Sequence, residues 1–390
     1  MTYNLIIPRD PLIFRDGRPF TADPGSQARS LPFPYPSTVV GALRHRAGVD
    51  PATGIFDTNR IAEVLNHYLR GPILVELDDQ DMVKDVLLPA PGDALLMNTE
   101  NGVGAMRYWQ RPLKMPLNAE ADFTQFAIVG VAGIIKGKPY PYQPAFWRLS
   151  SYLQWLETPL DGPVELDQLG INKLPTESRV HVSIIPDKQT ALPGALFQTS
   201  ALEFTQAESE VGTFNLSATR RLGILLETDA VLSDGLGLLG GEHRVASWKD
   251  IRKNNPLPNC PASIREKIKR SKACRVILLT PAYFEHGFFP TKVLENQGLN
   301  LQAVLVHRYQ TVSGWDYEKG GPKPTRRLAP SGSVYYLKFD DELSDAKLDA
   351  FIASVWLRNI SDDEQSKADG FGLAILGTWD GNLREMEVEK

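Results

Sequence analysis

Strand-like and helix-like patterns follow one another in the same order in both halves of the chain. In the first half, strand patterns lie at Tyr3–Ile7, Ile73–Leu77, Lys84–Leu88 and Arg179–Ile185, and helix patterns lie at Thr38–Ala47, Arg60–Leu69 and Ala145–Leu156. In the second half, strand patterns at Arg221–Glu227, Cys274–Thr280, Ser333–Phe339 and Leu373–Trp379 alternate with helix patterns at Ser263–Arg270 and Asp345–Leu357. Apart from the extra helix in the first half, each set follows the β-α-β-β-α-β order.

This order predicts an α+β protein built from two tandem ferredoxin-like units with long insertions. The first unit is expected over residues 1–208, with an insertion at about 89–144. The second is expected over residues 209–390, with an insertion at about 281–332. Both insertions are rich in Gly and Pro, and the polar stretch Thr205–Thr213 is the expected join.

Composition excludes several classes of protein. With 42% hydrophobic and 23% charged residues, the chain has the balance of a globular protein. Apolar stretches such as Phe126–Ile135 are too short to span a membrane, and the first residues lack the features of a secretory signal, so a cytoplasmic location is expected. Two cysteines and six scattered histidines give no disulfide framework and no metal-ligand spacing. We therefore expect neither metal nor cofactor.

The charge is unevenly distributed. The net charge is −5, but residues 249–275 hold nine Lys/Arg against two Asp/Glu, a local charge of +7. Residues 340–390 hold five Lys/Arg against thirteen Asp/Glu, a local charge of −8. A basic face of this kind could bind a polyanion, although both runs could equally be solvated surface.

The segment Gly235-Leu-Gly-Leu-Leu-Gly240 matches the GxGxxG pattern of dinucleotide-binding proteins. That pattern requires a helix to begin directly after the loop, and Gly241-Glu-His-Arg-Val245 does not favour a helix start, so we reject this interpretation. Gly240, Gly241 and Arg244 remain as a candidate phosphate site, formed by backbone amides and a guanidinium. The alternative is a glycine-rich turn with Arg244 in a salt bridge.

The helix that begins near Ser37 is more informative. Ser37 and Thr38 lie in its first turn, where free amides could bind phosphate. Gly41 costs about 1 kcal/mol relative to Ala inside a helix, which indicates close approach by another element or a ligand. Arg44 and Arg46 follow and could supply charge, while the preceding Phe33 and Tyr35 could stack bases. The alternative is that Gly41 packs on the sheet and the arginines are solvated.

Two weaker signals remain. Gly370 and Gly372 lead into the last predicted strand, where they could admit a nucleic-acid strand or a neighbouring loop. The cluster Asp78-Asp-Gln-Asp81 could bind a hard cation, but a solvated hairpin turn explains it more simply. No GxxxxGK[ST] loop, GxSxG elbow or HExxH helix occurs in the chain.

Together, five segments resemble the RAMP proteins of CRISPR effector complexes. More narrowly, they resemble the type III-B (Cmr) subunits that cap the five-prime, repeat-derived handle of the guide RNA. The segments are Phe14–Phe20, Pro36–Arg44, Arg179–Val182, Leu239–Arg244 and Arg327–Tyr336. His243 stands where a small residue is expected in this family, and the family's last glycine motif is sparse in Gly370–Gly377.

The resemblance implies two ferredoxin-like folds and a non-catalytic crRNA-binding role in antiviral defence. It also implies contacts with the large polymerase-like subunit and the first backbone RAMP subunit. The hypothesis is that arginines neutralise handle phosphates while glycines let the RNA strand bend; the phosphate-binding arginines are Arg44, Arg46, Arg244, Arg326 and Arg327. The insertion at 89–144, with Arg107, Tyr108, Trp109 and Arg111, could project and wedge the guide at the handle boundary.

Two other functions stay open. A RAMP endoribonuclease would process repeat RNA by general acid/base chemistry, with His45 as its first candidate acid. The second open function is a scaffold that contacts only proteins and no RNA. Because the net charge is −5, we expect the isolated chain to bind RNA weakly and in a salt-sensitive manner.

Overall fold

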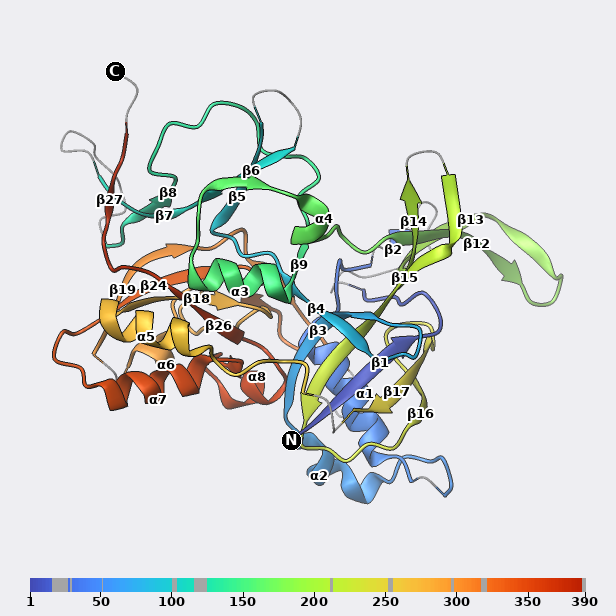
Figure 1. The fold of residues 1–390 in the computed structure, drawn as a ribbon. Coiled ribbons are helices and arrows are strands. Elements are labelled where there is room, and N and C mark those ends of the chain that lie inside the picture. The colour runs from blue at the N-terminus through green and yellow to red at the C-terminus, as the bar shows by residue number, and fades with distance from the viewer. Residues whose placement is uncertain are drawn as a thin grey trace. The chain divides into compact units, whose positions relative to one another are not determined.

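The computed structural model describes residues 1–15, 27–28, 30–50, 52–99, 104–115, 125–210, 213–251, 255–295, 298–316 and 321–387. The chain folds into two compact units (Figure 1). Unit 1 comprises residues 1–84, 173–255 and 311–326, and unit 2 comprises residues 85–172, 256–310 and 327–390. Both units mix helices with antiparallel sheets, in agreement with the predicted mixed class, whereas the tandem ferredoxin-like arrangement stays a prediction.

The main sheet of unit 1 has the strand order β3-β15-β1-β17-β16, and every neighbouring pair is antiparallel. Its strands are β1 (Thr2–Pro8), β3 (Leu69–Leu77), β15 (Thr213–Thr228), β16 (Gly235–Leu238) and β17 (Val245–Asp250). Leu5 and Ile6 of β1 are fully buried, because β1 lies between β15 and β17. The strand predicted at Tyr3–Ile7 is thus confirmed.

The expected join between domains is part of this sheet. Strand β14 (Thr205–Glu210) pairs antiparallel with the first part of β15, and both strands belong to unit 1. The units also interleave along the chain, whereas the predicted domains meet at 208/209. The difference arises because β15 pairs with β1 and β3, both from the first 84 residues.

Unit 1 contains helix α1 (Pro36–Gly48), the short 3-10 helix η1 (Thr58–Arg60) and helix α2 (Ile61–Leu65). Helix α1 buries Val39, Val40 and Leu43, which confirms the helix predicted at Thr38–Ala47. The second predicted helix, Arg60–Leu69, is shorter than expected. Leu69 begins β3 and pairs with Thr228, so pairing with β15 overrides the local helix pattern.

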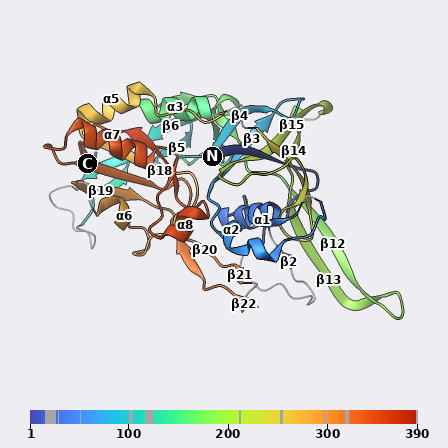
Figure 2. The ribbon, with the colours of Figure 1, turned by 90° about the horizontal axis from the view of Figure 1, so that it is seen from below.

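A long hairpin forms a separate sheet of unit 1, with the order β12-β13-β2. Its strands are β12 (Thr176–Ile185), β13 (Thr190–Leu202) and β2 (Gln27–Ala28). Figure 2 shows β12 and β13 as one extended hairpin. The strand predicted at Arg179–Ile185 exists, but its partner is β13 rather than a strand of the main sheet.

The main sheet of unit 2 has the order β19-β24-β18-β26-β25, again with antiparallel neighbours. Its strands are β18 (Ala273–Leu278), β19 (Leu299–Leu305), β24 (Val334–Phe339), β25 (Arg358–Asn359) and β26 (Leu373–Thr378). Helices α3 (Leu149–Glu157), α5 (Ala262–Ser271) and α7 (Asp345–Val355) contact β26. The predicted strands that end at 280, 339 and 379 and both helices predicted in the second half are therefore confirmed to within about two residues, whereas the strand predicted at Arg221–Glu227 is the last part of the longer β15 in unit 1.

The insertion expected at 89–144 contains more strand than predicted. It holds β5 (Ala94–Asn98), β6 (Ala105–Trp109), β7 (Arg111–Lys114) and β8 (Ile128–Gly130), of which only β8 had a sequence signal. The remaining strands and helices are β4 (Val83–Pro89), β9 (Phe146–Arg148), β10 (Gly162–Val164), α4 (Leu166–Leu169), β11 (Gly170–Ile171), α6 (Thr291–Leu294), β20 (Gln310–Val312), β21 (Trp315–Asp316), β22 (Gly321–Pro322), β23 (Arg326–Leu328), α8 (Glu364–Ala368) and β27 (Arg384–Glu385). None of the described helices has the length and apolar character needed to cross a bilayer.

Of the residues proposed to wedge the guide, Trp109 is packed inside unit 2, whereas Arg107, Tyr108 and Arg111 are half-buried. Trp109 is 8% exposed, and the Arg107 guanidinium lies 4.7 Å from the Trp155 ring. Beside them, Arg275 forms a fully buried ion pair with Asp93, whose other carboxylate oxygen accepts a hydrogen bond from Trp155 Nε1 (2.9 Å). Strand β6 is thus a structural part of unit 2 and Trp109 does not project, whereas a guide contact by Arg107, Tyr108 or Arg111 stays a prediction.

Candidate nucleic-acid interface

One side of helix α1 faces solvent and carries a glycine at its middle. Ser37, Gly41 and His45 recur at four-residue spacing, which places them along the same side of the helix. Gly41 is exposed, and a Cβ atom added to it would have no heavy atom within 4 Å. The alternative that Gly41 packs on the sheet is therefore wrong. Within the described residues nothing requires a glycine at this position.

The N-terminal turn of α1 carries no acidic residue and no side-chain cap. The Thr38 amide bonds to the Tyr35 carbonyl (3.0 Å), and the Tyr35 hydroxyl lies 3.5 Å from the Thr311 carbonyl. Ser37 and Thr38 are half-buried at the start of this face. Their hydroxyls and the positive end of the helix dipole would favour an anion at this end of the face.

The two arginines of α1 hold neighbouring segments of unit 1. Arg44 is buried, and its Nη2 donates to the His67 carbonyl (3.0 Å). Arg46 donates to the carbonyls of Leu236 (2.7 Å) and Ser233 (2.6 Å). Burial lowers the pKa of Arg46, and the nearby Asp234 opposes that shift. RNA contacts by Arg44 and Arg46 stay a prediction, and any phosphate would have to compete with these carbonyls.

The GxGxxG segment forms β16, which turns back into β17, so no helix begins after it. This confirms the rejection of a dinucleotide-binding loop. A Cβ at Gly237 would lie 2.8 Å from Trp248 Nε1 and 3.1 Å from Arg46 Nη1. The glycine therefore makes room for the side chains that tie α1 to β16.

Gly240 and Gly241 lie against residue 13 of the same unit. Gly240 has φ +80°, and the Gly241 amide donates to the Ile13 carbonyl (2.8 Å). Arg244 is largely buried, with Nη2 3.6 Å from Glu242 Oε2. This geometry matches the alternative of a glycine-rich turn with Arg244 in a salt bridge. A phosphate contact at this turn stays a prediction.

The last two arginines lie on β23, where Arg326 belongs to unit 1 and Arg327 to unit 2. Arg326 is half-buried, whereas Arg327 is exposed and its guanidinium lies 4.8 Å from the centre of the Tyr309 ring. Tyr309 is 49% exposed, so an unstacked base could reach its ring. Tyr309 was not among the residues predicted to bind RNA, although His307-Arg308-Tyr309 beside a strand is a basic and aromatic signal.

Gly370 and Gly372 are buried within unit 2. Both have positive φ, +97° and +82°, and a Cβ at Gly372 would lie 2.7 Å from the Ser361 amide nitrogen. The Gly370 carbonyl accepts from the Thr280 hydroxyl (2.8 Å). The close approach at Gly372 thus comes from a neighbouring loop of the chain itself. Contact with RNA stays a prediction for both glycines.

The structure thus connects α1 and the β16–β17 hairpin of unit 1 through Arg46, whereas Arg327, Gly370 and Gly372 belong to unit 2. Of the segments that carry the RAMP resemblance, residues 16–20 lie outside the described part of the chain.

In the turn at Asp78–Asp81, the Asp81 carboxylate is paired with basic side chains of the chain itself. Asp81 forms ion pairs with Arg221 and with Lys249 (3.1 Å), and Arg9 lies 4.0 Å away. Burial alone would raise the pKa of Asp81, but hydrogen bonds from Lys249 and Arg221 lower it overall. This favours the hairpin-turn interpretation. Among the described residues, no group of three or more His, Cys, Asp or Glu side chains could hold a metal ion.

A further feature of unit 1 had no clear sequence signal. The β12–β13 hairpin exposes large apolar side chains, including Val180 (69%), Val182 (41%), Ile184 (62%) and Leu196 (58%). Val182 lies directly opposite Leu196, so these two share one face. Exposed apolar surface of this kind indicates a contact surface.

Residues 4–379 match the model of the family described as CRISPR-associated protein (Cas_Cmr3). The chain belongs to this family. The match confirms the resemblance found in the sequence, and membership of this family makes the chain a subunit of a type III-B CRISPR effector.

Solved structures resemble the chain more distantly. One is titled as the type III-B Cmr-beta bound to cognate target RNA and AMPPnP, state 1, and shares 12% identity, a TM-score of 0.43 and 86% coverage of each chain. Another, titled as the type III-B Cmr-beta bound to cognate target RNA, shares 14% identity and a TM-score of 0.44 with the same coverage. No curated protein sequence matches the chain.

Proposed function

We propose that this chain caps the five-prime, repeat-derived handle of the crRNA without cleaving it, and that it joins the large polymerase-like subunit to the first backbone RAMP subunit. Family membership supports a place in the complex. The observation that carries RNA binding is the empty space over Gly41 on the exposed face of α1. A sugar-phosphate backbone can approach a helix closely only where side chains are small.

In this proposal each unit makes its own contribution. In unit 1, Ser37 and Thr38 contact phosphate at the start of α1, and the strand runs over Gly41. Arg46 mainly fixes α1 to β16, since its guanidinium already donates to two carbonyls. In unit 2, Arg327 neutralises phosphate and Tyr309 stacks an unpaired base.

The decisive experiment fills the space over Gly41. Gly41→Leu improves helix propensity by roughly 1 kcal/mol, so the variant should fold at least as well as the wild type. It should nevertheless bind the handle at least about tenfold more weakly in the assembled complex, because the new side chain blocks close approach. Ala350→Leu is the control, because it adds a similar side chain at an exposed position of α7.

Two outcomes would overturn handle capping. One is unchanged affinity of Gly41→Leu for the guide. The other is equal binding of a guide with an intact handle and a guide with a scrambled handle.

The endoribonuclease alternative has one observation in its favour. His45 is exposed on the same face as Gly41, with its ring stacked on Phe56 at 5.5 Å between centroids. Purified protein incubated with repeat RNA should leave the RNA intact. Cleavage that His45→Ala abolishes would replace the capping role with a processing role.

A further inference from the structure

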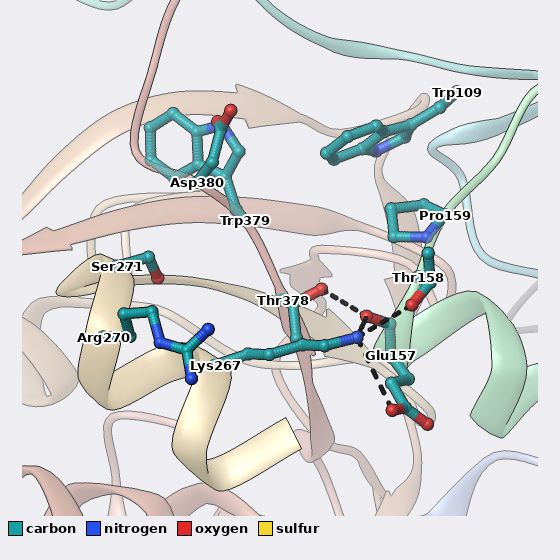
Figure 3. A pocket seen from close by; sticks show the side chains of 10 residues that line it. All are labelled: Trp109, Glu157, Thr158, Pro159, Lys267, Arg270, Ser271, Thr378, Trp379 and Asp380. Atoms are coloured by element: carbon teal, nitrogen blue, oxygen red, sulfur yellow. Dashed lines mark hydrogen bonds and ion pairs between the residues drawn. The ribbon is translucent and has the colours of Figure 1, made fainter. Parts of the chain in front are cut away.

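A cavity of about 410 Å³ opens on unit 2, and its lining includes none of the residues proposed to bind RNA. We call it the Trp109–Trp379 slot. It is lined by Trp109, Glu157, Thr158, Pro159, Lys267, Arg270, Ser271, Thr378, Trp379 and Asp380 (Figure 3). The residues come from the ends of β6, α3, α5 and β26, so the walls are fixed by regular structure. Its volume lies within the usual range of ligand pockets.

The upper walls of the slot are aromatic. Trp109 and Trp379 lie on opposite sides of the opening in Figure 3, with Thr378 below them. Both indoles are held in place, since Trp379 packs edge-on against Tyr336 (5.4 Å between centroids) and Trp109 lies beside Arg275. They are also largely covered, at 2% exposed for Trp379 and 8% for Trp109, so an inserted group would reach only a small part of each ring. Indoles that line a preformed cavity bind an inserted apolar group without losing side-chain freedom.

Most charged groups of the slot already have partners. Lys267 Nζ contacts the Glu157 carbonyl (3.1 Å), Glu157 Oε1 (3.5 Å) and the Thr158 hydroxyl (2.9 Å). Asp380 Oδ2 lies 2.5 Å from Arg384. Both carboxylates are therefore neutralised by cations of unit 2.

Arg270 is different from the other cations of its helix. Arg265 and Lys269 lie within 4 Å of Asp349, and Lys272 lies 4.0 Å from Asp345. Arg270 is exposed and makes no hydrogen bond or ion pair with any residue that the structure describes. The slot thus combines an apolar cavity with a single unpaired guanidinium at its rim.

We propose that the Trp109–Trp379 slot is a docking site for a segment of another protein subunit. The segment inserts one aromatic or large aliphatic side chain between the indoles and places a nearby carboxylate on Arg270. One carboxylate matches one guanidinium and can bind it through two parallel hydrogen bonds. An RNA strand fits less well, because its successive phosphates would need several free cations, whereas Lys267 is already bonded to Glu157 and Thr158. Buried aromatic side chains and Arg carry much of the energy of protein interfaces.

The test uses the full chain in the assembled effector complex. A photoreactive benzoylphenylalanine replaces Thr158, which is exposed at the rim. After irradiation, the expected crosslink lies in another protein subunit, on a segment with Asp or Glu within about two residues of a large apolar side chain. Arg270→Glu and Arg270→Ala should each lower the crosslink yield at least about tenfold, the factor that corresponds to loss of one charge-assisted contact.

Lys347→Glu is the matched control, because Lys347 is an exposed cation on α7 that has no partner within the described residues. It should leave the yield unchanged. A crosslink to RNA, a crosslink to a second copy of this chain, no crosslink, or a yield that survives Arg270→Glu would each overturn the proposal. Handle binding is measured separately and should not change in Arg270→Glu, so failure of this inference is distinguishable from failure of RNA capping.

Discussion

Single residues explain one departure from the family pattern. His243 has φ +53°, a conformation that glycine adopts freely but other residues adopt at a cost of roughly 1–2 kcal/mol. Its side chain is exposed and forms no hydrogen bond with the described residues. The expectation of a small residue at this position therefore has a backbone cause, which the sequence alone did not reveal.

His243→Gly should raise the free energy of unfolding by up to about 1 kcal/mol, because relief of the strained φ exceeds the entropy that glycine adds to the unfolded chain. Denaturant titration followed by circular dichroism measures the change. His286→Gly serves as control, since His286 is also exposed but has a negative φ, and it should be neutral or destabilising. Equal effects at both positions would show that strain at His243 is not the cause.

Asp81 gives a prediction about pH. Its pKa is lowered in the folded chain by Lys249 and Arg221, whereas an unfolded Asp titrates near 3.9. The ion pairs therefore stabilise the fold above about pH 4, and this contribution is lost as the pH falls through the lowered pKa. Asp81→Asn should be less stable than the wild type at pH 6, and the difference should shrink steadily on acidification below pH 4. A difference that stays constant with pH would exclude this linkage.

Secondary-structure elements were predictable where their pattern is local. Helix α1 has regular apolar spacing, and β18 and β24 are almost continuous apolar runs, so each was found from the sequence. Strands β5, β6 and β7 were missed, because all three are short and because β6 and β7 mix Arg, Lys or Pro with apolar residues. Their stability comes from packing around Asp93 and Arg275, which are 182 positions apart.

In the candidate site, too, local features were predictable from the sequence, whereas features set by distant segments were not. The cost of glycine inside a helix indicated close approach at Gly41; the structure leaves open space there, so approach by a ligand stays a prediction. It could not show that Arg44 is buried or that Gly372 faces Ser361, since both depend on segments far away in the chain. The pairing of β12 with β13 could not be predicted either, because a strand pattern does not show which strand it pairs with.

The exposed hairpin face predicts self-association of the isolated chain at high concentration. Replacing Val182 with Lys and Leu196 with Glu, which lie opposite each other, should reduce association and change stability by less than about 0.5 kcal/mol. Light scattering over a concentration series checks this. Val231→Lys changes one exposed apolar residue outside the hairpin and should leave association unaltered. Unchanged scattering in the double variant would exclude the hairpin as the contact.

At the scale of the whole molecule, local patterns did not reveal how the chain divides between its two units. Each unit draws on three separated stretches of sequence. In unit 1, β1 pairs with β15 and β17, which lie more than 200 residues further along the chain. Short-range periodicity carries no information about such pairings, so contiguous domains were the natural expectation.

Net charge and local charge act in opposite directions in RNA binding. The chain as a whole carries −5, so binding of a handle RNA by the isolated chain must rest on a few local cations and should weaken steeply with salt. For single-stranded RNA, each phosphate contact contributes roughly 0.7 to the slope of log affinity against log salt. Arg327→Ala should therefore lower the slope by about 0.7, as measured by filter retention between 50 and 200 mM salt.

Arg358→Ala removes one exposed cation of unit 2 that has no partner within the described residues, and it should leave the slope unchanged. If both variants reduced the slope equally, the effect would reflect overall charge rather than a contact at Arg327. A slope that neither variant changes would place the phosphate contacts elsewhere, and α1 of unit 1 would then be the region to test, through Ser37→Ala and Thr38→Ala.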